Sequence, residues 1–162
     1  MSGLAAINAM AEEEAGAAML ACCGSKRWAR RMAERRPFSS EADLFADAGR
    51  IWGELSERDW LEAFAAHPKI GERASGQAAA EQAGARGASP ETLAALARAN
   101  REYEERFGYI FIVCASGRSA EEMLDLCRRR LHNAPAEELK VAAEEQRRIT
   151  RLRLEKWLIS LR

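Results

Sequence analysis

The spacing of apolar residues limits this chain to a helical fold. Over most of its 162 residues, apolar side chains recur at every third or fourth position, and proline is scarce, with four in all. This spacing places apolar side chains on one face of a helix, and the abundant alanine has the highest intrinsic helix propensity. We therefore predict an all-α fold for residues 1–162, a single-domain helical bundle of about seven to eight helices that can bury its own core.

Residues that can cap a helix mark the predicted helix starts. Three serines stand three residues before an acid, which is the spacing of a capping box: Ser40, Ser56 and Ser119. Asn8 is the predicted cap of a first helix that runs through about residue 22, and Ser25 opens the next helix. Ser89 opens a later helix together with the proline that follows it. The last helix is predicted over about residues 136–160.

One run of the chain does not fit the helical pattern. Residues 109–115 have the sequence Y-I-F-I-V-C-A, and their β-branched and aromatic side chains favour a strand. Because the chain has no second run of this kind to pair with it, we expect one extended, buried segment that crosses the core. Its backbone N–H and C=O groups then need partners outside a sheet, which helix ends, water or a ligand can supply.

Composition argues against several classes of function. Lys plus Arg equals Asp plus Glu, 25 against 25, so the chain lacks the basic excess of a general nucleic-acid binder. No apolar run approaches the roughly 20 residues of a membrane-spanning helix, and the N-terminus lacks the pattern of a secretory signal. We therefore expect a cytoplasmic protein with no nucleic-acid and no membrane partner.

Metal and cofactor sites are not indicated either. The four cysteines form no C-x-x-C pair, and the chain has only two histidines, which disfavours a zinc site. The cysteines are interpreted as small buried apolar residues in a reducing compartment. No phosphate-binding loop, nucleophile elbow or dinucleotide fingerprint occurs. The sequence is therefore consistent with cofactor-free chemistry, or with no chemistry.

The stretch over residues 64–84 carries the candidate acid–base groups. His67 ends an apolar helical pattern and is followed by proline, while Glu81 lies among small residues. Taken alone, His67 is more often a helix-end cap, and Glu81 is more often a solvated surface group. If the two converge in a dry pocket, they can hold a proton where a reaction needs it. The other histidine, His132, lies in an Arg-rich stretch and is expected at the surface.

The last predicted helix is rich in arginine, and a solvated basic face is the usual interpretation of such a pattern. Its four arginines are Arg147, Arg148, Arg151 and Arg153. Arg153 stands between two leucines and four residues from Ile149, so it can instead point inward. There its planar guanidinium suits a carboxylate.

Several motifs together resemble one family. The motifs, in chain order, are C-C-G-S-K-R-W-A, R-P-F, F-A-A-H-P-K-I-G, A-E-Q-A-G, N-R-E-Y-E-E-R-F-G-Y-I-F-I-V-C-A-S-G, R-R-R-L-H-N and I-T-R-L-R-L. On these motifs, which span nearly the whole chain, the protein resembles the decarboxylases of 2-oxo-4-hydroxy-4-carboxy-5-ureidoimidazoline (OHCU) in urate breakdown. The resemblance implies an all-helical, cofactor-free enzyme, often a homodimer. Its small-molecule substrate OHCU is converted to (S)-allantoin with loss of carbon dioxide.

The resemblance also implies roles for individual residues. His67 corresponds to the catalytic histidine and Glu81 to the catalytic glutamate. Arg153 corresponds to the arginine that meets the substrate, with Arg151 as a second candidate. The implied substrate-binding positions are Pro68, Ala78, Gln82, Phe111, Ile112, Val113, Cys114 and Ala115.

One position departs from the family pattern. Many relatives carry a serine three residues before the glutamate, where this chain has Ala78, so a hydroxyl contact is missing or comes from elsewhere, such as Ser75. Two other functions stay open. One is a helical interaction module of the same fold that has lost catalysis. The other is an Arg-rich regulator of an acidic partner, which the zero net charge disfavours.

Overall fold

The computed structural model describes residues 1–69, 81, 83–85 and 87–162 of the chain. Every regular element among these residues is a helix, which confirms the all-α prediction. The described chain forms two compact units, the first of Met1–Ala63 with Arg147–Arg162 and the second of Phe64–Gln146. The single-domain organisation stays a prediction. Within the described part of the chain, no helix is both long enough and apolar enough to cross a membrane.

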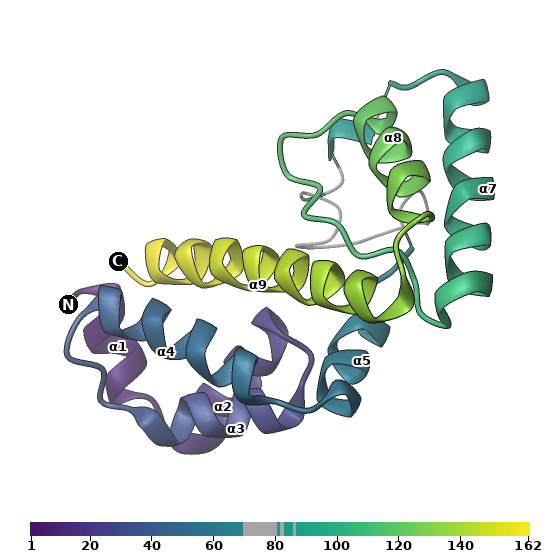
Figure 1. Ribbon diagram of the computed structural model, residues 1–162. Helices are drawn as coiled ribbons and strands as arrows, with labels where there is room; N and C mark the ends of the chain where they lie inside the picture. Colours follow the sequence, from purple (N-terminus) through teal and green to yellow (C-terminus); the bar gives the residue numbers. More distant parts are fainter. Residues whose placement is uncertain (70–80, 82, 86) are drawn as a thin grey trace. The chain divides into compact units, whose positions relative to one another are not determined.

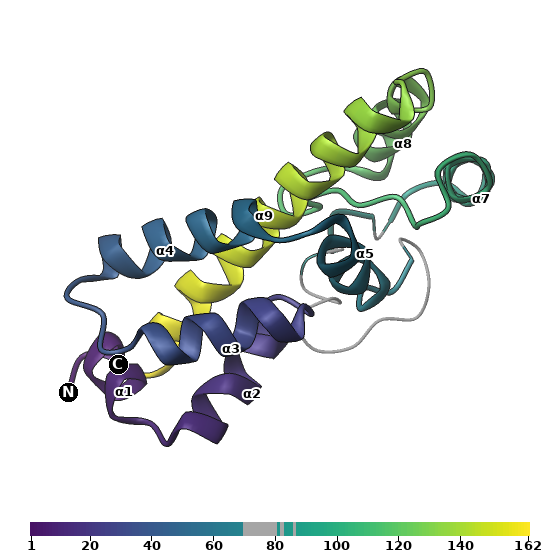
Figure 2. The same ribbon diagram turned by 60° about the horizontal axis from the view of Figure 1, so that its bottom comes forward.

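The first unit contains most of the N-terminal helices. It comprises α1 (Gly3–Ala9), α2 (Glu12–Cys22), α3 (Lys26–Arg35), α4 (Glu41–Glu54), most of α5 (Glu57–Ala65) and the C-terminal part of α9 (Pro135–Ser160) (Figure 1). Helix α3 packs against both α2 and α4, and Figure 2 shows α2 and α3 side by side. Trp28, Met32, Leu44 and Ile51 are completely buried in this unit. The apolar faces of these helices therefore form its core, as their spacing predicts.

The first predicted helix is wrong in its extent. Two helices, α1 and α2, replace one helix from Asn8 to about residue 22, and Ser2 rather than Asn8 caps the first. Instead, the Asn8 side chain donates to the Phe38 carbonyl (3.0 Å) and accepts from the Phe38 N–H (2.9 Å). The amide that is suited to a local cap therefore holds the chain between α3 and α4.

The serine caps lie where the sequence predicts them. The hydroxyl oxygen of each cap accepts from the backbone N–H three residues later at Ser25, Ser40, Ser56, Ser89 and Ser119. At Ser56 and Ser119 the acid three residues on accepts from the serine N–H in return, which completes a capping box. Because each cap satisfies a backbone donor at a helix start, it contributes about 0.5–2 kcal/mol to helix stability.

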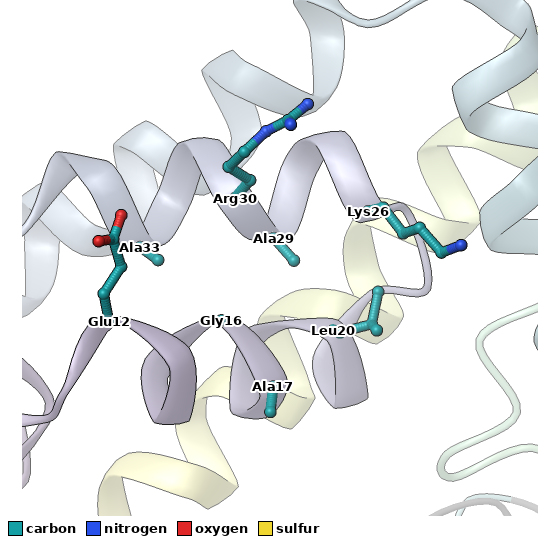
Figure 3. Close-up of a pocket in the computed structure, with 8 residues that line it drawn as sticks. All are labelled: Glu12, Gly16, Ala17, Leu20, Lys26, Ala29, Arg30 and Ala33. Carbon is teal, nitrogen blue, oxygen red and sulfur yellow. The ribbon is translucent and has the colours of Figure 1, made fainter.

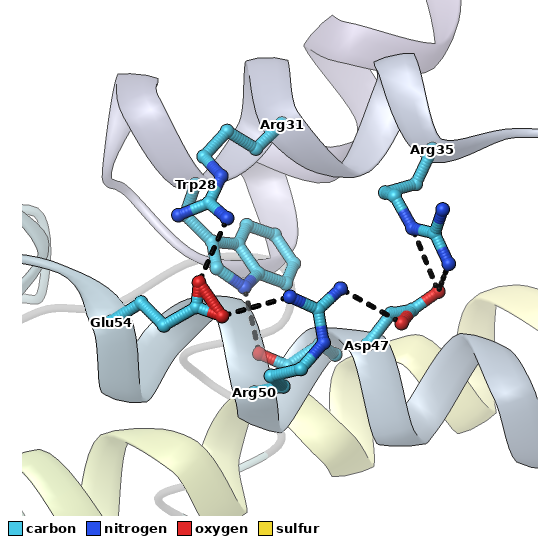
Figure 4. A network of polar contacts seen from close by, with 7 residues as sticks. Trp28, Arg31, Arg35, Asp47, Arg50 and Glu54 are labelled. Atoms are coloured by element: carbon cyan, nitrogen blue, oxygen red, sulfur yellow. Dashed lines mark hydrogen bonds and ion pairs between the residues drawn. The ribbon is translucent and has the colours of Figure 1, made fainter.

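A network of charged side chains joins α3 and α4 on the surface of the first unit (Figure 4). Arg50 donates to Asp47 (3.0 Å) and to Glu54 (2.8 Å). Arg31 donates to Glu54 (3.0 Å), and Arg35 to Asp47 (3.3 Å). The hydrogen bonds from Arg31 and then Arg50 hold the pKa of the Glu54 carboxyl below its usual range. Each carboxylate thus serves two arginines.

The second unit is built around α7 (Pro90–Phe107) and α8 (Ala120–Arg130), which pack against each other (Figure 1). It also holds the 3₁₀ turn η1 (Ala83–Ala85) and the N-terminal part of α9. Helix α7 ends at Gly108, whose φ of 83° is the left-handed conformation that glycine adopts without strain. Most of the run that follows is buried and is neither helix nor strand, which confirms the predicted buried segment over residues 109–115.

Candidate active site

His67 stands just beyond the C-terminal end of α5. Its backbone N–H donates to the Phe64 carbonyl (3.2 Å), and its side chain is half-buried. Because Pro68 disfavours the α conformation in the residue before it, the helix ends here. Phe64 is completely buried and packs on Tyr109, with 5.3 Å between the ring centroids. The end of α5 therefore holds the histidine against the start of the buried segment.

The His67 ring contacts a residue that the sequence analysis did not single out. His67 Nε2 lies 2.6 Å from Oε1 of Gln146, which is completely buried on α9. One signal could have found Gln146: it stands four residues after Ala142 and three before Ile149, which are both buried. That spacing puts a polar amide on the apolar face of the helix.

The backbone of the buried segment bonds to side chains. The Ile112 carbonyl accepts from Arg130 Nη1 (2.7 Å). The Cys114 N–H donates to Glu145 Oε1 (3.1 Å), and the Cys114 carbonyl accepts from Arg118 Nε (3.1 Å). The expectation that helix ends, water or a ligand would supply the partners is therefore wrong for these three groups. Charged side chains from α8, α9 and the α7–α8 connection take that place.

A buried cluster of charged side chains anchors this segment. Arg130 donates to Glu138 through Nε (2.9 Å) and Nη2 (2.6 Å), and its guanidinium lies over the Phe111 ring, 4.6 Å from the centroid. The Tyr103 hydroxyl donates to the same carboxylate. Burial is the main reason why the pKa of Tyr103 is raised well above its usual value. Because removing one member of a buried ion pair leaves an uncompensated charge, the cluster resists rearrangement.

Glu81 is half-buried and belongs to the same unit as His67. Burial raises the pKa of the Cys114 thiol, and the negative charges of Glu145 and Glu81 raise it further. The structure therefore brings Glu81 near the segment that the resemblance assigns to substrate contacts. Gly84, in the motif that follows Glu81, lets the backbone lie against Arg118, since a Cβ on Gly84 would overlap the Arg118 carbonyl. Convergence of His67 with Glu81 stays a prediction.

The two candidate arginines of α9 lie in the first unit and differ in their surroundings. Arg153 is half-buried, donates to the Ala21 carbonyl (3.4 Å), and lowers the pKa of the Cys22 thiol, which burial raises to about 12. Arg151 is exposed, pairs with Glu155 (3.1 Å) and lies over the Phe45 ring at 4.2 Å. These surroundings favour Arg153, and its role at the substrate stays a prediction.

Three further predictions cannot be followed in the structure. Ala78 and Gln82, and Ser75 as the alternative source of a hydroxyl, lie outside the described residues.

Pro68 is described and half-buried beside His67. His132 is exposed, which confirms its expected surface position.

A separate cavity of about 260 Å³ lies between α2 and α3 in the first unit (Figure 3). Glu12 and Lys26 stand at its opposite ends, and small side chains line the space between them. The lining residues are Glu12, Gly16, Ala17, Leu20, Lys26, Ala29, Arg30 and Ala33. This set includes no residue of the predicted site.

Comparison with known proteins points to one family. The sequence profile of the family described as OHCU decarboxylase matches residues 8–155. The 2-oxo-4-hydroxy-4-carboxy-5-ureidoimidazoline decarboxylase of Amia calva is 34% identical over 128 residues, covering 74% of this chain and 73% of that protein. The uric acid degradation bifunctional protein TTL of Arabidopsis thaliana is 41% identical over 145 residues, covering 83% of this chain. This chain spans 44% of the length of that bifunctional protein.

Solved structures agree with the sequence relatives. The crystal structure of OHCU decarboxylase in the presence of (S)-allantoin matches with a TM-score of 0.79 and 39% identity, covering 92% of this chain and 99% of that chain. A crystal structure of (S)-allantoin synthase matches with a TM-score of 0.76 at 18% identity, which shows the shared fold alone. The family profile matches most of this chain, and the alignment with the Amia calva relative, at 34% identity, covers more than two thirds of that protein. The chain therefore belongs to the OHCU decarboxylase family.

Proposed function

We propose that this chain is a carbon–carbon lyase that decarboxylates OHCU to (S)-allantoin in urate breakdown. The observation that carries the proposal is the match of the family profile to residues 8–155, a range that includes His67, Glu81 and Arg153. A related decarboxylase of the same fold was crystallised in the presence of (S)-allantoin, the product that the proposal requires.

The structure of the substrate defines what the site must do. In OHCU, carbon 4 carries both the hydroxyl and the carboxylate, so the one ring double bond of the imidazoline joins carbon 5 to a nitrogen. When the bond from carbon 4 to the carboxylate breaks, its electron pair forms a double bond to carbon 5. The electron pair of the carbon–nitrogen double bond moves onto nitrogen, which takes up a proton. Because the ring supplies its own electron sink, the proposal includes no cofactor.

The second half of the reaction moves protons. The hydroxyl on carbon 4 loses its proton and becomes the carbonyl of allantoin, while carbon 5 gains a proton. His67 hydrogen-bonds the hydroxyl and, paired with Glu81, manages its proton as carbon dioxide leaves. Protonation of carbon 5 from one face, with the His67–Glu81 pair as the source, gives the S configuration. The guanidinium of Arg153 orients the anionic substrate.

The remaining substrate contacts are assigned to Pro68, Ala78, Gln82 and the backbone of residues 111–115. The anchoring of this backbone by Arg130 and Glu145 supports the assignment, since a held backbone presents its other hydrogen-bonding groups in a constant arrangement. A flat ureidoimidazoline offers several donors and acceptors to such a surface. Rigid placement of the reacting groups is a large part of enzymatic rate acceleration.

We also infer that the protein acts as a homodimer in the cytoplasm, with no nucleic-acid or membrane partner. Its four cysteines are free, which fits a reducing compartment. Lys plus Arg balances Asp plus Glu, which does not favour binding to nucleic acid. The dimer rests on the family resemblance, and size-exclusion chromatography with light scattering tests it.

One assay separates the enzyme from the alternative function. Freshly generated OHCU is mixed with the purified protein, and circular dichroism follows the formation of (S)-allantoin, which is chiral. We expect the signal to appear much faster than in the spontaneous decay of the substrate. Decay at the spontaneous rate would favour a non-catalytic helical interaction module, with Ala78 as the sequence feature that accompanies the loss.

A further inference from the structure

Two adjacent residues of α9 hold two different parts of the candidate site. Oε1 of Glu145 accepts from the Cys114 N–H at 3.1 Å, and Oε1 of Gln146 lies 2.6 Å from His67 Nε2. The side chain of Gln146 is completely buried and Glu145 is nearly so. All four residues lie in the second unit. One turn of α9 therefore sets the position of the histidine relative to the buried segment.

The hydrogen bond between Gln146 and His67 has a defined donor and acceptor. With Oε1 of Gln146 facing the ring, His67 Nε2 is the donor of this hydrogen bond, because a carbonyl oxygen can only accept. In a neutral imidazole the proton on Nε2 leaves Nδ1 with the lone pair. Nδ1 is then the ring nitrogen that can accept a proton. The amide also orients the ring without placing a negative charge beside Nε2.

We propose that Gln146 is a positioning residue for the decarboxylation, which holds His67 as the Nε2–H tautomer and turns Nδ1 toward the substrate hydroxyl. This inference rests on the proposed function, because it assigns the proton-accepting atom of the proposed catalytic histidine. Because Nε2 then faces Gln146 and Nδ1 faces the substrate hydroxyl, Glu81 acts on His67 through the bound substrate and not through a direct hydrogen bond to the ring. A second partner that sets the tautomer is a recurring requirement for a histidine that moves protons.

The tautomer can be measured in the free protein, without any assay of activity. Long-range proton–nitrogen NMR correlations distinguish Nδ1 from Nε2, and the chain has only two histidines. Exposed His132 is the internal reference. In the wild type at a pH where both rings are neutral, we expect His67 to show the pattern of a single Nε2–H tautomer. A single Nδ1–H pattern for His67 would overturn the proposal.

The variant Gln146→Met removes the acceptor and keeps a side chain of similar length. We expect its His67 to become a mixture of tautomers, while His132 does not change. The matched control is Thr150→Val, which removes another buried polar group of α9. The control should leave both histidine spectra unchanged. An Nε2–H pattern that survives in Gln146→Met would show that another group holds the ring.

Kinetics separates positioning from substrate binding. We expect Gln146→Met to lower kcat roughly 10- to 100-fold, less than the ~10²–10⁴-fold effect of a general acid or base, with little change in KM. A change in KM alone would contradict a positioning role. If the wild type fails to accelerate decarboxylation, the proposed function fails, whereas the tautomer measurement still decides what Gln146 does to His67.

Discussion

The two units of the molecule each contain a network of arginines and carboxylates, and the networks differ in burial. In the first unit the side chains of Arg50 and Glu54 are 48% and 44% exposed. In the second unit those of Arg130 and Glu138 are 8% and 0% exposed. The surface network joins α3 to α4, whereas the buried one holds the Ile112 carbonyl of the candidate site at 2.7 Å.

The comparison shows how burial changes the role of the same residue types. Water can solvate each charge of an exposed ion pair, and salt screens their attraction, so the pair contributes little to the free energy of folding. Water does not reach the charges of a buried pair, so removing one of them leaves the other uncompensated. For Arg130, burial alone disfavours the cation, but the Glu138 hydrogen bonds and the neighbouring Tyr103 raise its pKa above the usual value. A charged cluster can therefore fix a backbone only where water is excluded.

The largest expected effect is on the proposed acid–base chemistry of His67, in the second unit. His67→Ala removes the proposed acid–base group and should lower kcat by about 10²–10⁴-fold. Because the ring is only half-buried, the thermal midpoint should change by no more than a few degrees. The measurement is turnover of OHCU together with thermal unfolding. The matched control, His132→Ala, alters an exposed histidine and should keep full activity. Near wild-type turnover in His67→Ala would sink the assignment.

The next largest effect tests the buried network directly. Arg130→Met leaves the Glu138 carboxylate without its cation and should lower the free energy of unfolding by about 3–5 kcal/mol. Adjacent Arg129 supplies the control, because its pair with Asp125 (2.9 Å) is 66% exposed on both sides. Arg129→Met should cost about 0–1 kcal/mol. Urea unfolding of both variants measures the difference.

A double variant sharpens this comparison. Arg130→Met combined with Glu138→Leu removes both charges, so it should recover part of the stability that Arg130→Met loses. The Ile112 carbonyl lacks its donor in both the single and the double variant, so we expect both to be less active than the wild type even where stability returns. Equal losses from Arg129→Met and Arg130→Met would contradict the distinction between exposed and buried pairs.

A smaller effect is expected at the buried segment of residues 109–115, where Glu145 accepts from the Cys114 N–H. Glu145→Leu leaves the buried Cys114 N–H without its acceptor and should destabilise the fold by about 1–3 kcal/mol. It should also raise KM, because the backbone that is proposed to contact the substrate loses one of the side chains that anchor it. Glu145→Gln keeps an oxygen at the same place and is expected to retain most of both properties. Unfolding curves and steady-state kinetics of the two variants test this, and a similar KM for both would count against it.

The sequence predicts the features that depend on neighbours in the chain. The serine caps could be predicted because each hydrogen bond reaches only three residues along the chain. The buried segment could be predicted because its apolar residues are consecutive in the sequence. Asn8 was misinterpreted because its amide bonds to Phe38, thirty residues away. A local pattern cannot distinguish a cap from a partner that is distant in the sequence.

The partners of the candidate site were missed for the same reason. Gln146 lies 79 residues from His67, and Glu145 lies 31 residues from Cys114. A signal was nevertheless present in α9, where Glu138, Glu145 and Gln146 fall at spacings of three and four from buried Ala142. Polar residues on the apolar face of a helix are costly unless they are paired, so their presence indicates a partner. The meeting of Arg153 with His67 and Glu81 still rests on the family resemblance.

The smallest expected effect belongs to the surface network. The hydrogen bonds from Arg31 and Arg50 hold the pKa of Glu54 below its usual value of 4.5. A group whose pKa is lower in the folded state stabilises the protein above its unfolded-state pKa, and this contribution is lost as pH falls through the folded-state pKa. Glu54→Gln should therefore lower the thermal midpoint slightly at neutral pH, and the gap to the wild type should close between about pH 5 and pH 3.

Salt should narrow the same gap at neutral pH, because ions weaken the attraction between exposed charges. Glu105→Gln, at an exposed glutamate of α7, is the control and should show neither response. Thermal unfolding at several values of pH and salt measures both. If Glu54→Gln destabilised the protein as much as Arg130→Met, exposure would not be what separates the two networks.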